Sequence, residues 1–530
     1  MFLLGYDLGS SSVKAAMVDA GTGATVGQVQ YPDTEMAILA PQSDQAEQHP
    51  ADWWAAIAQV TRRLLATTGI SPDQIAGIGI AYQMHGLVLL DAGGEVLRPA
   101  IIWCDSRAVD IGDQAFAALG EAYCLEHLAQ SPGNFTASKL RWVRENEPAI
   151  FEKIHKFLLP GDYIAYRMTG EMCTTVTGLS EGICWDFPNH CPARRLLDFY
   201  EIPERMLADR VPVFAQQGKL TAAAAAQLGL VAGIPVAYRA GDQPNNALSL
   251  NVLRPGDVAA TGGTSGVVYA VTDQPRPDPA LRFNSFAHVN YSPEKPLTGA
   301  LLCINGAGSQ YRWLRQQFGA APRQTTPSRL TGDAKDKTTG SSTRLTTKSR
   351  QTRTTLTYQE LELLAAQAAI GADGLCVLPF GNGAERMLGN RNIGAQISGI
   401  NVNRHAQDHL CRATLEGIAY AFVYGMEAMR SVGIPLRVLR VGNDNLFQSA
   451  VFSQTIATLI GAEIEMLATT GAVGAAKGAG VGVGLYQSVE EAMGGIAVQR
   501  IFSPDKDRGA YAGAYARWKS VLAAAMREEA

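Results

Sequence analysis

Residues 236–266 read V-A-Y-R-A-G-D-Q-P-N-N-A-L-S-L-N-V-L-R-P-G-D-V-A-A-T-G-G-T-S-G, and this stretch decides the predicted fold. A β-rich run over residues 234–238 stops at Gly241 and Asp242. A carboxylate at the end of a strand, beside a glycine, lies where α/β enzymes usually place their chemistry. We therefore predict that Asp242 is the catalytic residue. An Asp before a Pro-Asn-Asn run is also a common turn or capping residue, so Asp242 alone does not establish a site.

The second part of the stretch predicts a phosphate-binding turn. A Pro-Gly break at 255–256 precedes a strand over 257–260, which runs into the turn Thr261–Gly266. Turns rich in backbone N–H groups and hydroxyls form nests that bind phosphate oxygens. The alternative is an ordinary hairpin loop. A candidate base and a candidate phosphate loop therefore lie about twenty residues apart.

The N-terminus contains a similar unit. We predict strands over 2–7, 13–18 and 24–31, with the pattern Asp-x-Gly-Ser-Ser-Ser-x-Lys at the first turn. The turn hydroxyls and amides can hold phosphates, and Asp7 can position a hydrated Mg²⁺, which prefers few carboxylates and several waters. A plain Ser-rich hairpin is the alternative.

Two further polar groups follow predicted strands in the first half. Gln83-Met84-His85-Gly86 ends a strand over 75–82, and Trp103-Cys104-Asp105-Ser106-Arg107 follows a hairpin. We expect His85, Asp105 and Arg107 to converge on a polyhydroxy ligand. A lone His at a strand end is more often a structural hydrogen-bonding group.

Two Gly-rich segments lie near the C-terminus. Gly442-Asn443-Asp444-Asn445 ends a predicted strand, and the Gly/Ala-rich run 471–480 opens a predicted helix. Small residues in a helix allow close approach, either by a nucleotide or by a neighbouring helix. Both interpretations of the second segment stay open at the level of sequence.

Composition narrows the class of protein. The chain has 530 residues, which is too long for one core and predicts two or three domains. Its apolar content of 47% and charged content of 18% are typical of a globular protein, and a net charge of −4 gives no field for nucleic acid or an anionic membrane. The N-terminus does not read as a signal peptide, and no stretch is long and apolar enough to span a bilayer. We expect a cytoplasmic protein.

The run 322–355 differs from the rest of the chain. It has few apolar residues and many threonines and basic residues. Such a composition does not supply a core face and predicts a disordered or weakly ordered excursion. A basic patch for an anionic partner is the alternative.

Both halves thus begin with a strand, a Gly/Ser/Thr turn and a second strand, which resembles the duplicated ribonuclease-H-like architecture of sugar kinases, actin and heat-shock chaperones. Within that group the chain resembles the FGGY carbohydrate kinases from Leu4 to about Tyr486. The motifs that carry the resemblance are D-L-G-S-S-S-V-K (7–14), T-x-x-K-L-x-W (136–142), A-G-D-Q (240–243), T-G-G-T-S-G (261–266) and L-E-G-I-A-Y-A (415–421).

The resemblance implies an α/β fold in which two ribonuclease-H-like (actin-like ATPase) domains flank an interdomain cleft. Residues 1–247 would bind the sugar and carry the base, and residues 248–530 would bind the nucleotide. The M-H-G and W-x-D-x-R motifs, L-P-x-D-Y at 159–163 and Glu385-Arg386 are similar to the xylulokinase branch. That branch implies ATP-dependent phosphorylation of D-xylulose at its 5-hydroxyl, with Mg²⁺.

The resemblance also assigns roles to residues. Asp242 would be the general base, and Asp7 and Asp242 would hold Mg²⁺ through water. The implied sugar-binding residues are Met84, His85, Trp103, Asp105, Arg107, Asp242 and Gln243. The implied residues for ATP are Ser10, Ser11, Ser12, Lys14, Gly263, Thr264, Ser265, Gly442, Asn445, Gly474 and Gly478.

The chain departs from the family pattern at two places. Ala-Gly-Asp-Gln replaces Gly-Gly-Asp-Asn around Asp242, which leaves the role of Gln243 open, and Gly-Asn-Asp-Asn at 442–445 replaces a glycine-rich adenosine motif. Rival interpretations are a kinase for ribulose, a hexulose, gluconate or glycerol, and a non-enzymatic ATP switch like actin or the chaperones. The expected partners are a small sugar and ATP, without nucleic acid or membrane; a homodimer stays open.

Overall fold

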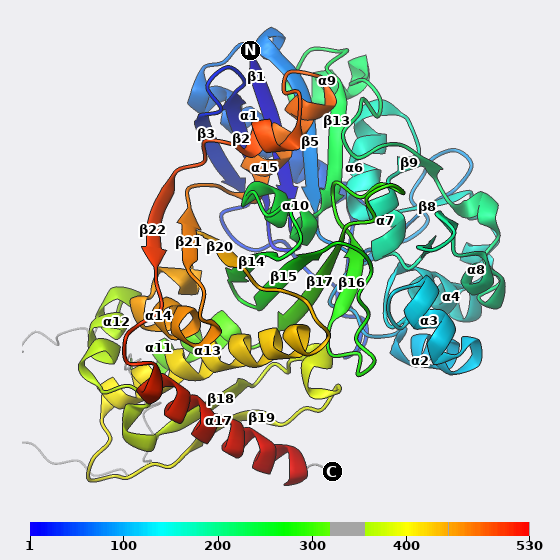
Figure 1. Ribbon diagram of the computed structural model, residues 1–530. Coiled ribbons are helices and arrows are strands. Elements are labelled where there is room, and N and C mark those ends of the chain that lie inside the picture. Colours follow the sequence, from blue (N-terminus) through cyan, green and yellow to red (C-terminus); the bar gives the residue numbers. More distant parts are fainter. Residues whose placement is uncertain (319–355, 444, 529–530) are drawn as a thin grey trace, which may run out of the picture.

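The computed structural model describes residues 1–318, 356–443 and 445–528 and contains two mixed β-sheets surrounded by helices (Figure 1). The predicted low-complexity run 322–355 lies outside the described residues.

The first sheet has the order β13-β5-β1-β2-β3. Strands β1, β2 and β3 form the predicted antiparallel meander, and β5 and β13 add to β1 in parallel. The turn between β1 and β2 is tight, since the Gly9 N–H donates to the Ser12 carbonyl at 3.0 Å. The strands are β1 (Phe2–Leu8), β2 (Val13–Asp19), β3 (Thr25–Tyr31), β5 (Ile75–Tyr82) and β13 (Val236–Gly241).

The second sheet repeats this order. Its strands run β16-β17-β15-β14-β20-β21-β22, in which β17-β15-β14-β20-β21 matches β3-β2-β1-β5-β13 in order and direction. The duplication confirms the predicted fold class. The strands are β14 (Asp257–Gly262), β15 (Gly266–Thr272), β16 (Asn284–Ala287), β17 (Thr298–Ile304), β20 (Val438–Gly442), β21 (Ile464–Leu467) and β22 (Val498–Phe502).

Helices cover both sheets, and short two-stranded pieces complete the structure. The helices are α1 (Pro50–Thr68), α2 (Val109–Leu119), α3 (Glu121–His127), α4 (Thr136–Asn146), α5 (Pro148–Phe151), α6 (Pro160–Thr169), α7 (Val176–Glu181), α8 (Arg194–Phe199), α9 (Ala222–Leu228), α10 (Asp242–Ser249), α11 (Ala307–Gln317), α12 (Tyr358–Gln367), α13 (Gln407–Ser431), α14 (Ala450–Ile460), α15 (Gly471–Gly482), α16 (Val489–Met493) and α17 (Arg508–Glu528). The short strands are β4 (Glu47–Gln48), β6 (Val88–Leu90), β7 (Ala100–Ile101), β8 (Lys156–Leu158), β9 (Cys173–Thr174), β10 (Trp185–Asp186), β11 (Cys191–Pro192), β12 (Asp209–Arg210), β18 (Cys376–Phe380) and β19 (Gly394–Ser398).

Helix α1 covers one face of the first sheet. Pro50 suits its first turn, and Gly69 ends it in the left-handed conformation (φ 66°). Its buried side chains include Trp53 and Ile57, which belong to one core cluster with Leu4 of β1. Burying a side chain of this size contributes about 1.5–3 kcal/mol.

The opposite face of the first sheet is covered by α15, which returns from the far end of the chain (Figure 1). Side chains of a strand alternate between faces, so residues 3, 5 and 7 of β1 face α15. A Cβ on Gly5 of β1 or Gly79 of β5 would clash with the backbone of α15. The small residues of both partners thus permit a very close approach. Residues 471–493 therefore pack on the first sheet, and the division of the chain at 247/248 stays a prediction.

Among the described residues, no helix is both long and apolar enough to cross a membrane.

Candidate active site

Asp242 lies where β13 ends and α10 begins. It is the first residue of the helix and is partly buried. Burial, followed by the negative charge of nearby Asp7, raises the pKa of Asp242 to about 7. A hydrogen bond from the Gln243 side chain acts in the opposite direction. A general base works best when its pKa lies near the operating pH, so this carboxylate is suited to accept a proton from a hydroxyl.

Asp7 brings a second carboxylate to the same place. It lies at the end of β1, on the face that α15 covers, and a Cβ at Gly471 would lie 2.7 Å from its Oδ2. Lys14 is its partner across the β1–β2 hairpin. Burial raises the pKa of Asp7, and Lys14 opposes that rise. The Asn245 Nδ2 donates to the Gly471 carbonyl at 2.9 Å, which joins α10 to α15 beside both carboxylates.

His85 is held in a strained turn by two residues that the sequence did not assign to the site. Its φ of 61° is unusual for a non-glycine residue. The His85 N–H donates to Glu181 Oε1 at 3.4 Å, and His85 Nδ1 donates to the Glu181 carbonyl at 2.9 Å. Lys139, whose side chain is buried, donates to the His85 carbonyl at 3.0 Å.

These contacts decide what the His85 ring offers to a ligand. Burial, together with the charge of Lys139, lowers the pKa of His85 to about 3, so the ring is neutral. A carbonyl oxygen only accepts, so the proton of the neutral ring is on Nδ1. Nε2 therefore carries a lone pair and accepts a hydrogen bond from a hydroxyl. This is the polarity expected of a sugar-binding group.

Glu181 also brings the His85 turn to the end of β13. A Cβ on Gly241 would clash with Glu181 Oε2 and with Met84 Cγ, so both side chains lie against the backbone next to Asp242. Burial and the neighbouring carboxylates Asp162 and Asp242 raise the pKa of Glu181 well above its usual value. Met84, His85 and Asp242 are thus brought together as predicted. Glu181 gave no signal in the sequence, because its contact depends on how α7 packs on β13.

Lys139 joins the two predicted sugar motifs. Besides the His85 carbonyl it donates to the Ile102 carbonyl at 2.9 Å, directly before Trp103. Trp103 is 40% exposed, and its Nε1 donates to Ser10 Oγ at 3.4 Å. The T-x-x-K-L-x-W motif contains this lysine. In the structure its buried ammonium group orders both loops.

Asp105 and Arg107 are buried in these loops, and their predicted role in sugar binding stays a prediction. Their side chains are 0% and 1% exposed and pair with each other, with Nη2 to Oδ2 at 2.7 Å. Arg107 also pairs with Glu47 at 2.7 Å, and Asp105 accepts from the Ala46 N–H at 2.6 Å. Buried charges persist when they are paired in this way, so the W-x-D-x-R motif supports the fold behind Trp103.

The two Gly/Ser/Thr turns have the predicted hairpin geometry. In the second half, the Gly308 and Ser309 N–H groups donate to the Gly263 and Thr264 carbonyls at 3.0 and 3.1 Å, so α11 starts beside the turn. Thr264 is exposed. No pattern in the sequence places Ser309 beside this turn, because only folding brings α11 there.

The residues predicted for the nucleotide divide into two groups. Asn445 lies beside the second turn, since a Cβ on Gly263 would be 4.0 Å from its Nδ2, and Gly442 ends the neighbouring strand β20. Gly474 and Gly478 instead face the first half: a Cβ on Gly474 would clash with Ser249 of α10, and one on Gly478 would be 2.7 Å from the Tyr238 ring of β13. Both glycines permit close packing of α15, and their predicted nucleotide role stays a prediction.

Asp7 and Asp242 fit a Mg²⁺ ion that is held mainly by water and phosphate. Among residues 1–318, 356–443 and 445–528, no group of three His, Cys, Asp or Glu side chains could hold a metal ion. Mg²⁺ bound with phosphates needs only one or two carboxylates. The donor set of two partly buried carboxylates is therefore consistent with the predicted metal.

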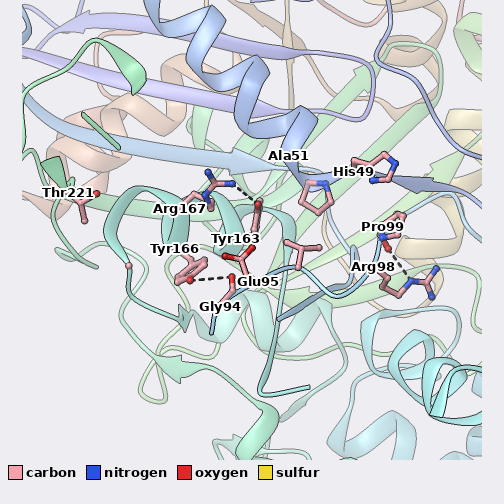
Figure 2. Close-up of a pocket in the computed structure, with 13 residues that line it drawn as sticks. His49, Ala51, Gly94, Glu95, Arg98, Pro99, Tyr163, Tyr166, Arg167 and Thr221 are labelled. Carbon is pink, nitrogen blue, oxygen red and sulfur yellow. Dashed lines mark hydrogen bonds between the residues drawn. The ribbon is translucent and has the colours of Figure 1, made fainter. Parts of the chain in front are cut away.

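A large cavity lies elsewhere on the first half, between α1, α6 and the residues before β7 (Figure 2). Its volume is about 630 Å³. Inside it Arg167 donates to Tyr163 Oη at 2.9 Å, and Tyr166 Oη donates to the Gly94 carbonyl at 3.3 Å. None of the predicted catalytic or binding residues lines this cavity. We therefore assign the chemistry to the surroundings of Asp242.

The chain matches a known family along most of its length. Residues 2–249 match the N-terminal domain of the FGGY family of carbohydrate kinases, and residues 258–483 match its C-terminal domain. Among curated proteins, the chain is 28% identical over 476 residues to the xylulose kinase of Haemophilus influenzae, covering 88% of this chain and 87% of that protein. It is 27% identical over 517 residues to the xylulose kinase of Escherichia coli, covering 95% of each.

Solved structures give the same result. A xylulose kinase from Rhodospirillum rubrum superimposes with a TM-score of 0.81 at 26% identity, over 99% of both chains. A gluconate kinase from Lactobacillus acidophilus superimposes with a TM-score of 0.84 at 19% identity, covering 100% of this chain and 99% of that one; this likeness supports the fold alone.

Proposed function

The chain belongs to the FGGY family of carbohydrate kinases, and from this premise we propose that it transfers the γ-phosphoryl group of ATP to the 5-hydroxyl of D-xylulose. The observation that carries the proposal is Asp242, with its raised pKa, beside Met84 and His85. The named xylulose kinases among the similar proteins support the choice of sugar.

Asp242 acts as the general base. Its carboxylate accepts the proton of the sugar hydroxyl while that oxygen attacks the γ-phosphorus. The new O–P bond forms as the bond from the γ-phosphorus to the bridging oxygen of ADP breaks. Phosphoryl transfer depends on positioning and charge neutralisation more than on covalent catalysis, so one base with a pKa near 7 is sufficient.

The first half orients the sugar. His85 Nε2 accepts a hydrogen bond from a sugar hydroxyl, because Glu181 holds the proton on Nδ1. Met84 and Trp103 supply apolar surface on either side of that loop. Lys139 fixes both loops through their backbone carbonyls, so the sugar meets a preorganised surface.

The two turns bind the phosphates. The amides and hydroxyls of Gly263, Thr264 and Ser265 face the β- and γ-phosphates, with Asn445 and Gly442 toward the nucleoside. Ser10, Ser11, Ser12 and Lys14 of the first turn complete the binding of the transferred group. A Mg²⁺ ion held through water by Asp7 and Asp242 would neutralise charge on the phosphoryl oxygens.

The test is ADP release from Mg-ATP in the presence of a panel of acceptors. D-xylulose is compared with D-ribulose, L-xylulose, gluconate, glycerol and no acceptor. Strong stimulation by D-xylulose alone is the expected result. Stimulation by another acceptor would replace the substrate but keep the role of Asp242. Slow hydrolysis that no acceptor changes would favour an ATP switch and overturn the proposal.

A further inference from the structure

Arg386 reaches from the second half of the chain to the sugar-binding loops of the first. It belongs to the 3-10 turn Glu385–Leu388, which follows β18. Its guanidinium carbon lies 5.5 Å from the centre of the Phe135 ring. A Cβ on Gly133 would clash with Arg386 Nη2, so this glycine leaves the space that the guanidinium fills.

The ring beneath Arg386 is part of the surroundings of His85. The Phe135 ring lies 4.7 Å from the His85 ring, measured between centroids, and the Phe286 ring lies 5.1 Å from it on another side. Phe286 belongs to β16 and therefore also comes from the second sheet. The positive charge of Arg386 adds a small contribution to the lowered pKa of His85. His85 is thus enclosed by groups from both halves.

The hydrogen-bonding groups of the Arg386 side chain have no partner among the described residues. Within the described part of the chain, its guanidinium makes no hydrogen bond and no ion pair, although the residue is partly buried. Burial lowers the pKa of Arg386, and the nearby carboxylates Glu385 and Asp113 oppose this shift without pairing with the guanidinium. A guanidinium has five N–H donors, and none of those of Arg386 is used by a described residue, so all of them are available to a ligand. Oxygen atoms of a ligand beside His85 would satisfy them.

Glu385, the neighbouring residue, gives this turn a second unusual feature. Its φ is 41°, a strained value for a non-glycine residue, and such strain concentrates at functional sites. The Glu385 side chain is directed to Cys303 of β17, which is itself close enough to Asp242 for the two to interact electrostatically. The turn therefore spans the distance between the His85 loop and the catalytic base.

We propose that Arg386 donates hydrogen bonds to the oxygen atoms of the bound sugar and is a specificity-determining residue for the acceptor. The inference rests on the proposed function, because it requires a sugar beside His85. Its consequence is that the sugar site is incomplete in the first half alone. A bound sugar then joins the two halves, with His85 accepting hydrogen bonds and Arg386 donating them.

The test compares R386M with R386K and with the control R404M. Arg404 is an exposed arginine of the same half. Its ion pair, at 3.4 Å, is with Asp373, which is not a residue of the site. KM for the sugar, KM for ATP and kcat are measured, together with the sugar-induced rise in melting temperature without ATP. R386K keeps the charge but loses the planar fork of donors.

For R386M we expect KM for the sugar to rise about 10- to 100-fold and the sugar-induced thermal shift to disappear, as for a lost charged hydrogen bond. KM for ATP should stay within about 2-fold, since a partner of the sugar alone does not alter nucleotide binding. R386K should lie between R386M and wild type, and R404M should equal wild type. If R386M does not fold, R386K carries the test.

Two outcomes overturn the inference. An unchanged KM for the sugar would show that Arg386 does not bind it, and a raised KM for ATP with an unchanged KM for the sugar would assign Arg386 to the phosphates. The kinetics are measured with whichever acceptor the wild type phosphorylates, so a wrong sugar does not count against Arg386. If no acceptor stimulates the wild type, the proposed function fails, and this inference fails with it.

Discussion

The β1–β2 and β14–β15 hairpins occupy equivalent places in the two sheets but carry different chemistry. In the first, Asp7 stands across from Lys14; in the second, Thr261 stands across from Val267. The backbone is the same, and only the first hairpin has a charged pair beside its turn. The helices that follow the equivalent strands β13 and β21 differ in the same way. Helix α10 starts with Asp242, whereas α15 has no acidic residue in its first turn.

This asymmetry shows how a duplicated fold divides one reaction. Both copies supply turn amides and hydroxyls, which suit phosphate oxygens. Only the first copy places carboxylates beside its hairpin turn and at the start of the following helix, where they suit a hydroxyl proton and a metal ion. The acceptor is therefore expected on the first half and the nucleotide on the second, with the transferred group between them.

The strongest test of this division is D242N. Removing the base should lower kcat about 10²- to 10⁴-fold, the usual contribution of general base catalysis. Sugar binding should persist, because His85 and its supports are unchanged, and is measured by the sugar-induced thermal shift. D19N, at the end of β2 in the same half, is the control. Near-normal turnover of D242N would remove Asp242 from the mechanism.

The next test is D7N, which removes the other charge from the first hairpin. In the wild type, kcat/KM should fall as the pH drops below about 7, because protonated Asp242 accepts no proton. Asp7 raises the pKa of Asp242, so D7N should move this acidic limb to lower pH. Turnover at pH 8 should fall about 10- to 100-fold through weaker metal binding. An acidic limb at the same pH would exclude the coupling between the two carboxylates.

A third test asks whether α15 serves packing or nucleotide binding. G474A places a methyl group against Ser249 and should cost about 1–3 kcal/mol of unfolding free energy, as overpacking does. KM for ATP should not change in the folded protein. G509A is the matched control, because that helical glycine has open space around it and alanine favours a helix. A raised KM for ATP without loss of stability would support the predicted nucleotide role of Gly474 instead.

The smallest expected effect concerns the β14–β15 turn, which has no charged pair beside it. T264V keeps the shape of the side chain but removes its hydroxyl, so KM for ATP should rise about 5-fold, corresponding to one hydrogen bond. KM for the sugar should stay the same, as measured by initial rates with one substrate saturating. Equal changes in both constants would mean that the second turn does not act on the nucleotide alone.

Much of the fold could be predicted from local sequence. The strand–turn–strand units and the strand that ends at Asp242 depend on neighbouring residues, so apolar runs and Gly/Ser turns were sufficient to find them. The family motifs then placed Met84 and His85 beside Asp242, and the structure brings these three residues together.

The contacts that each side chain makes in the folded chain could not be predicted from the sequence. Asp105 is buried by its pairing with Arg107 and by the Ala46 N–H, which no local pattern reveals. Gly474 meets Ser249 only because α15 returns to the first sheet. Glu181 supports His85 across the fold and belongs to none of the motifs. Motifs identified which segments matter, whereas the direction of each side chain depended on tertiary packing.

The return of α15 has a consequence for synthesis on the ribosome. The strands of the first sheet are complete at Gly241, but the helix that covers one face begins only at Gly471. Until then the nascent chain exposes Leu3, Ala16 and Val18, which the finished protein buries under α15. The N-terminal half therefore completes its folding after almost the whole chain has been made, and a shortened chain that ends before α15 would depend on chaperones to stay out of aggregates.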